Sequence, residues 1–166
     1  MPKTVALILL ALFYLASGLS AAEPFFSYSF NGTVMDVLEG DVLSVLHKGK
    51  LIKVRLADVD CPEEGQAFSN EARKFSALLV YAGPVKVKVK ELDRRGQAVA
   101  EVILLDKGLS LNRELIKAGL AWWSWKNSDD MSYGDLEEAA REMKVGLWKA
   151  KEPTPPWEYH LKKDGH

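Results

Sequence analysis

One short stretch, residues 54–64 (VRLADVDCPEE), brings an arginine and four acidic side chains together at the end of an apolar run. Acidic groups this close repel one another unless a cation neutralises them, and their hard oxygens suit Ca²⁺ or Mg²⁺. Arg55 adds paired donors that match the oxygens of a phosphate. Cation, carboxylates and arginine together indicate phosphodiester chemistry. The plain alternative is a solvated acidic turn between two elements.

Alternation within this stretch predicts how the charged groups are presented. Val54, Leu56 and Val59 fall on the side directed to a core, and Pro62 ends the sheet ladder and turns the chain outward. Cys61 is the only cysteine of the chain. We expect it to be a small structural residue, because neighbouring carboxylates disfavour the thiolate that a nucleophile needs.

The first 22 residues have the pattern of an export signal. Lys3 precedes an apolar run over residues 5–15, and Ser20, Ala21 and Ala22 are the small residues that signal peptidase accepts. The run is short for a membrane span. We therefore expect cleavage after Ala22 and an exported protein, secreted or periplasmic, with no stable membrane insertion. A retained N-terminal anchor is the alternative.

The charge balance limits how the chain can bind a polyanion. The chain holds 22 Lys and Arg residues against 23 Asp and Glu residues, a formal net charge of −1, and loss of a leader with one lysine makes it −2. A protein that grips nucleic acid with its whole surface is normally basic. Any contact with nucleic acid must therefore be local. The length and the 48% apolar composition suit one domain with a real core.

Period-two alternation predicts five strands. The alternating segments are residues 25–37, 41–47, 51–59, 85–92 and 98–105. Short turns join the first three, which are therefore expected to be consecutive and antiparallel. The lysines of residues 85–92 share one face, where they either bind phosphates or protect an exposed strand edge.

Helical periodicity predicts three helices. The first covers residues 69–81, with Leu78 on its apolar face, and the second covers residues 110–118. Ser132 and Asp135 are spaced as a capping box for a third helix, whose apolar face includes Met143.

The order of the elements predicts an α+β protein, mainly β, built as a five-stranded OB-type barrel with about three packed helices. We assign residues 23–150 to this domain and residues 151–166 to a Pro-rich C-terminal tail that docks Trp157 and Tyr159 back onto it. Such barrels bind oligonucleotides and oligosaccharides on one face, but the fold alone does not establish an activity.

Four segments, in this order, resemble the staphylococcal nuclease-like (thermonuclease) family, especially its exported bacterial members. They are EGDVLSVLHKGKLIKVRLADVDCPEEGQAF, DRRGQAVAEVIL, SLNRELIKAGLAWW and GLWKAKEPTPPWEY. The similarity covers about residues 32–159, which is nearly the whole chain after the leader. It implies an OB-type barrel with packed helices and calcium-dependent cleavage of phosphodiester bonds in DNA and RNA.

The resemblance also implies roles for single residues. Asp41 and Asp60 match the two aspartates that bind Ca²⁺, and Cys61 matches the residue whose backbone carbonyl joins them. Arg55 matches the arginine that holds the scissile phosphate. Glu63 matches the proposed general base, which acts through a water.

The turn at residues 93–97 departs from the family pattern. It has the sequence Asp-Arg-Arg-Gly-Gln, where the family usually has Asp-Arg-Tyr-Gly-Arg, so Gln97 replaces an arginine that stabilises charge on the phosphoryl oxygens. Losing such a group costs about 3 kcal/mol, roughly a hundredfold in rate. Arg95 replaces a tyrosine that helps to hold the substrate phosphate. Either Arg94 or Arg95 reaches the phosphate and preserves some activity, or the protein binds its substrate and cuts it poorly.

A tryptophan cluster offers a platform for base stacking. We expect Trp122 and Trp123 to cover the core and Trp125 to contact substrate, because in the family a tyrosine near Trp125 packs against the nucleotide base. The three histidines are too scattered in sequence to indicate a zinc site or a nucleophile dyad.

Three functions are compatible with these patterns. The first is an exported calcium-dependent nuclease, weakened by Gln97, that acts as a monomer on DNA or RNA and prefers single strands. The second is a catalytically impaired OB-fold module that binds nucleic acid. The third is an envelope protein that binds a protein or sugar ligand. The retained carboxylates and Arg55 favour the nuclease, with Ca²⁺ as its cofactor.

Overall fold

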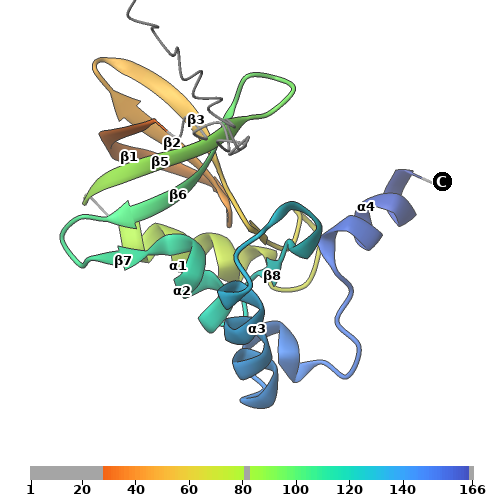
Figure 1. The fold of residues 1–166 in the computed structure, drawn as a ribbon. Coiled ribbons are helices and arrows are strands. Elements are labelled where there is room, and N and C mark those ends of the chain that lie inside the picture. Colours follow the sequence, from red (N-terminus) through yellow and green to blue (C-terminus); the bar gives the residue numbers. More distant parts are fainter. Residues whose placement is uncertain (1–27, 81–82, 165–166) are drawn as a thin grey trace, which may run out of the picture.

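The computed structural model describes residues 28–80 and 83–164, so the predicted leader, residues 1–22, lies outside the described part of the chain. The fold is a barrel of strands with helices packed below it in the view of Figure 1. Over the described ranges, no helix has both the length and the apolar character needed to cross a membrane.

Five strands of the described residues close the barrel. They are β1 (Ser29–Glu39), β2 (Val42–His47), β3 (Lys50–Leu56), β5 (Pro84–Leu92) and β6 (Ala98–Leu104). The first three are consecutive and antiparallel, β5 lies between β1 and β6, and β6 pairs in parallel with β3 to close the ring. A short strand, β7 (Leu109–Ser110), pairs antiparallel with the end of β6. The predicted mainly-β, OB-type barrel is confirmed.

The third strand ends earlier than its alternation predicts. β3 stops at Leu56, and Asp58 adopts a left-handed conformation with φ of 64°, so the chain bends before β4 (Val59–Asp60). β4 leaves the barrel and pairs with β8 (Trp122–Trp123). This bend directs the acidic stretch toward the helices instead of continuing the barrel wall.

Alternating side chains fill the barrel interior. Val85, Val87 and Val89 of β5 are buried, as are the alternate residues of β6. The lysines of β5 face outward, but β5 has a partner strand on each side, so the prediction that they protect a strand edge is wrong. Instead, Lys88 pairs with Glu101 at 3.1 Å.

Four α-helices occur in the described residues, one more than predicted. They are α1 (Ser69–Val80), α2 (Leu111–Lys117), α3 (Ser132–Glu142) and α4 (Pro156–Asp164), with short 3-10 helices η1 (Trp125–Asn127) and η2 (Gly146–Lys149). The fourth α-helix lies within the tail for which only docking aromatic residues were predicted.

Three details of the predicted helices are wrong. Leu78 is 78% exposed, because α1 is buried along Ala72, Ser76 and Val80. No capping box forms at α3, since Ser132 is already helical and its hydroxyl donates to Asp130. Met143, just past the end of α3, is exposed instead of sharing the buried face.

A buried side chain of α2 fixes the end of β3. Nδ2 of Asn112 donates to the carbonyl oxygens of Ala57 and Ala100 at 2.8 and 3.1 Å, and its Oδ1 accepts from N–H of Val102 at 3.0 Å. Because Ala57 follows β3 directly, these bonds hold the point at which the acidic stretch leaves the barrel.

A second, smaller core lies beneath the helices. The rings of Trp122 and Trp148 meet edge to face at 4.5 Å, and the guanidinium of Arg141 lies 3.7 Å from the Trp148 ring. Trp157 of α4 packs on Trp122 at 5.7 Å, so the predicted docking of the tail through this residue is confirmed. Trp122 is buried, as predicted, whereas Trp125 is 58% exposed.

Candidate active site

A close-packed turn positions the first aspartate. At Gly40 an added Cβ would lie 2.8 Å from both Cys61 Sγ and Ala72 Cβ, so no larger residue fits there. The hydroxyl of Ser76 donates to the Gly40 carbonyl at 2.6 Å and ties α1 to the turn. Asp41 follows at the base of this packing and is 2% exposed. Cys61 is buried in contact with the turn, which agrees with its predicted structural role.

Three of the predicted site residues come together at the ends of β2, β3 and β4. Arg55 Nη1 lies 3.4 Å from Asp41 Oδ2 and 3.9 Å from Asp60 Oδ1. The pairing of Val42 with Arg55 in the β2–β3 ladder places the arginine beside Asp41. The guanidinium therefore links two carboxylates that are 19 residues apart in sequence but adjacent in space.

The two aspartates carry more negative charge than Arg55 offsets. Burial raises the pKa of Asp41 to about 6, and Glu39 adds to the increase, while Arg55 opposes it. Burial and the neighbouring Asp41 raise the pKa of Asp60 to about 7. Although burial lowers the pKa of Arg55, the carboxylates raise it overall. A site with this imbalance favours an additional cation.

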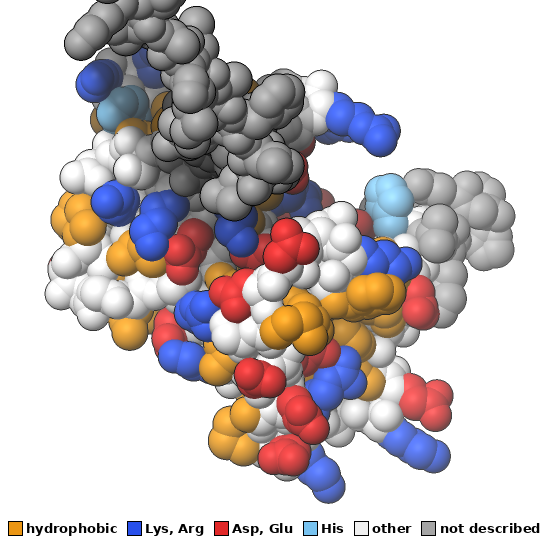
Figure 2. Space-filling view, viewed as in Figure 1, with side chains coloured by type: hydrophobic (Ala, Val, Ile, Leu, Met, Phe, Trp, Pro, Cys, Tyr) orange, Lys and Arg blue, Asp and Glu red, His pale blue; other side chains and the backbone are white. Residues whose placement is uncertain are grey.

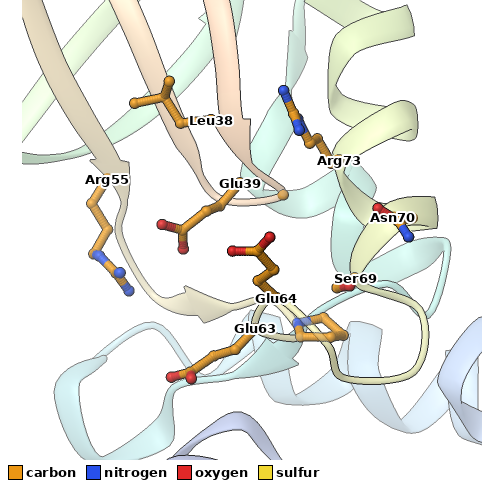
Figure 3. Close-up of a pocket in the computed structure, with 10 residues that line it drawn as sticks. Leu38, Glu39, Arg55, Glu63, Glu64, Ser69, Asn70 and Arg73 are labelled. Carbon is orange, nitrogen blue, oxygen red and sulfur yellow. The ribbon is translucent and has the colours of Figure 1, made fainter.

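A first hollow, of about 420 Å³, opens beside Arg55. Figure 3 shows the carboxylates of Glu39 and Glu64 directed into it, whereas Glu63 points away from both. Arg73 of α1 is occupied in holding the wall, because its Nε donates to the Val37 carbonyl at 2.8 Å. Glu39 was not predicted as a site residue, because a glutamate before a glycine is typical of a turn.

A second hollow, of about 660 Å³, begins on the other side of Arg55 and includes Asp60 and Val99. Asp58 lines it as well, in an ion pair with Lys90 of β5. Asp58 therefore shares this hollow with Asp60, but Lys90 balances its charge. The bend at Asp58 brings its carboxylate to Lys90 of β5.

The turn at residues 93–97 is built around one aspartate. Oδ1 of Asp93 accepts from the backbone N–H groups of Arg95 and Gln97, both at 2.8 Å, and these bonds lower the pKa of Asp93. Arg94 and Arg95 are exposed. Arg55 pairs with Val99 across the β3–β6 seam. Gln97 is the residue before β6 and two before Val99, so alternation predicts that it shares the face of Arg55.

The remaining predicted residues lie at the margins. Trp125 is exposed on η1, and the described walls of the two hollows do not include it. Glu63 lines the first hollow at its edge. A residue that sequence reasoning missed, His160, contacts its carboxylate, with Nδ1 at 3.2 Å from Glu63 Oε2. With 97 positions between them, no local pattern could have indicated this pair.

Charge on the visible surface is mixed. On the face drawn in Figure 2, basic and acidic side chains are interspersed, with no broad field of one sign. This agrees with the prediction that contact with a polyanion is local. The barrel and these side chains define an OB-type domain whose acidic cleft is bridged by an arginine.

Comparisons with known proteins show which family this domain resembles. Residues 53–150 match the model of the staphylococcal nuclease homologues. The chain is 36% identical over 140 residues to a micrococcal nuclease of Shigella flexneri, covering 78% of this chain and 80% of that protein. It is 37% identical over 124 residues to an uncharacterized endonuclease of Haemophilus influenzae, covering 74% of this chain and 68% of the relative.

A plant relative shows similarity over part of its length. The chain is 30% identical over 116 residues to a staphylococcal-like nuclease of Arabidopsis thaliana, which covers 70% of this chain and 35% of that protein. The family match spans more than half of the chain, and the bacterial relatives are covered over most of their length. The chain belongs to the staphylococcal nuclease family.

Proposed function

We propose that the protein is a calcium-dependent nuclease that hydrolyses phosphodiester bonds of DNA or RNA. The observation that carries the proposal is the position of Arg55, which bridges Asp41 and Asp60 and lines both hollows. A phosphate held there would lie at the junction of two hollows, with room for chain on either side. The nucleases and endonucleases among its relatives support the same activity.

The donor set fits Ca²⁺. Within the described residues, no group of three or more His, Cys, Asp or Glu side chains is gathered to hold a metal by itself. Ca²⁺ takes six to eight oxygens, including backbone carbonyls, water and phosphate, and two carboxylates can supply part of that set. Asp41, which is buried, and Asp60, which is partly exposed, are hard oxygen donors with raised pKa values, and Cys61 would add its carbonyl.

Each residue of the chain then has a defined task. Arg55 binds the phosphate through paired donors, and its own carboxylate partners restrict its orientation. Glu63 would accept a proton from the attacking water. A Ca²⁺ ion held by Asp41 and Asp60 would polarise the phosphate oxygen. Gln97, on the face shared with Arg55, donates a neutral hydrogen bond. Arg94, Arg95 and Trp125 contact substrate beyond the scissile phosphate.

The test is cleavage of labelled single-stranded DNA and RNA by protein that begins at Glu23. Cleavage is expected in Ca²⁺ and not with a chelator. Glu63→Gln should lower kcat by about a hundredfold or more, because a general base contributes on that scale. Glu71→Gln, an exposed change on α1, is the control and should have no effect. Cleavage that survives both the chelator and Glu63→Gln would contradict the proposal.

A second candidate function is favoured by Gln97. If the missing arginine is essential, the protein is a catalytically impaired module that binds nucleic acid. It would then bind single strands saturably without forming products. Export by residues 1–22 and a monomeric state also belong to the proposal. Recovery of the protein after export tests the first, and size-exclusion chromatography of the recovered protein tests the second.

A further inference from the structure

Residues 153–160, which belong to the C-terminal tail, pack against the loop of residues 62–68, here called the Glu63 loop. Together they line a hollow of about 300 Å³. Pro155 and Pro156 are buried at the start of α4. The hydroxyl of Tyr159 lies 3.1 Å from the position that a Cβ would take at Gly65. The two segments are therefore in direct contact.

One side chain joins the backbone of Glu63 to the tail. Oε1 of Gln66 accepts from the Glu63 N–H at 3.0 Å, and the Gln66 N–H donates to the Glu63 carbonyl at 2.9 Å. The other end of the same amide, Nε2, donates to the Thr154 carbonyl at 2.6 Å. Gln66 thus links the residue proposed as the general base to a segment 88 positions further along the chain.

A second contact reaches the carboxylate itself. Nδ1 of His160 lies 3.2 Å from Glu63 Oε2. His160 is carried by α4, and α4 is anchored through Trp157, which packs on the buried Trp122. The anchor fixes the helix on the second core, and the helix presents His160 to the loop.

The Glu63 loop needs such support. It contains no strand or α-helix, and Gly65 and Phe68 have φ of 87° and 68°. Its internal hydrogen bonds are few, and the Glu63 side chain is 33% exposed. A loop of this kind opens locally at low cost unless other elements hold it. A general base must be kept within a fraction of an ångström of its productive position.

We infer that the tail is a positioning element of the active site, with Gln66 and His160 as the two residues through which it orients Glu63. The inference rests on the proposed role of Glu63 as the base. The competing explanation is that the tail only stabilises the fold. The two explanations predict different effects of the same substitutions. If the tail orients Glu63, they lower the turnover number; if it only stabilises the fold, they change the midpoint of unfolding and not the turnover number.

The experiment measures kcat and KM on single-stranded DNA in Ca²⁺ for His160→Ala, His160→Gln and Gln66→Ala. Glu158→Gln, an exposed change on α4 outside these contacts, is the control. His160→Ala and Gln66→Ala should each lower kcat about fivefold or more, with KM within about twofold. His160→Gln, which keeps a donor, should restore at least half of the activity. Unchanged kcat in both alanine variants would overturn the inference, as would an equal loss in the control.

Amide hydrogen exchange gives a readout that does not depend on activity. In Gln66→Ala the amides of residues 63–68 should exchange about tenfold faster, while those of β5 are unchanged. If the parent protein does not cleave nucleic acid, the proposed function fails, and the exchange rates still test the tail contact. If the parent cleaves and neither kcat nor exchange changes, the positioning role alone fails.

Discussion

Replacing Gln97 by arginine tests the most informative departure of this chain from its family. Arg55 and Val99 are paired across the β3–β6 seam, and Gln97 lies two residues before Val99, where alternation predicts the same face. With strands about 4.8 Å apart and a rise of about 3.3 Å per residue, continuing the spacing of β6 back to Gln97 would place its Cα about 8 Å from that of Arg55. Two arginine side chains on this spacing can converge on one phosphate.

The expected gain follows from the charge of the new donor. A donor to developing negative charge contributes about 3 to 4 kcal/mol in a closed site, and the neutral amide of Gln97 already supplies about 1 kcal/mol. Gln97 is only partly buried, which lowers the difference to about 1.4 to 2.8 kcal/mol. Gln97→Arg should therefore raise the rate about tenfold to a hundredfold.

The assay is steady-state cleavage of single-stranded DNA in Ca²⁺, with Gln97→Met as a control of similar length that lacks the donor. The gain should appear in kcat, since the charge develops only in the transition state. Gln97→Met should lower kcat by a few-fold. An increase below about threefold, or one confined to KM, would refute the argument that Gln97 faces the scissile phosphate.

Three further changes test other parts of the structure. The pKa values of Asp41 and Asp60 are raised to about 6 and 7, so the metal-free fold retains protons that the unfolded chain releases. Its unfolding free energy should therefore fall as the pH rises from about 4 to about 7. Urea titrations should show a weaker pH dependence in Asp60→Asn, and Ca²⁺ should stabilise the parent at pH 8; a parent without this dependence would contradict the charge imbalance. Asn112→Ala should cost about 3 kcal/mol in urea unfolding, because it removes the side chain that pairs with the Ala57 carbonyl and the Val102 N–H in the core, and a loss below about 1 kcal/mol would contradict that. Gly119→Ala should cost about 2 kcal/mol or more in the same assay, since φ is 65° and the new Cβ would lie 2.4 Å from the Val145 carbonyl oxygen; a neutral result would show that the two segments can separate.

The barrel was predictable because its residues repeat with period two. The alternation of Val85, Val87 and Val89 with lysines required one buried face, and the structure has that face. The partners of those lysines were not predictable, because β5 becomes an interior strand only when β1 and β6 pair with it. Asp58 shows the same limit, since neither its left-handed φ nor its ion pair with Lys90 follows from the alternation of the strand.

The candidate site was predictable for the residues that match the family pattern and not for residues that only tertiary packing brings to it. The resemblance identified Asp41, Arg55 and Asp60, and the structure brings these three together. Glu39 was not predicted as a site residue, because a glutamate beside a glycine is typical of any turn. The contact of His160 with Glu63 was not predicted, because it depends on the docking of α4 through Trp157. Such contacts arise from tertiary packing, which leaves no periodic signal in sequence.

The parallel seam that closes the barrel also makes activity a sensitive measure of partial unfolding. β3 and β6 are joined by three residue pairs, Val54 with Ala98, Arg55 with Val99 and Leu56 with Ala100. Opening so short a seam costs less than unfolding the five-strand ring, so it is expected to occur first on heating. It would carry Arg55 away from the turn at residues 93–97 while β1, β2 and β5 stay paired. The protein would then lose its activity several degrees before its circular dichroism changes.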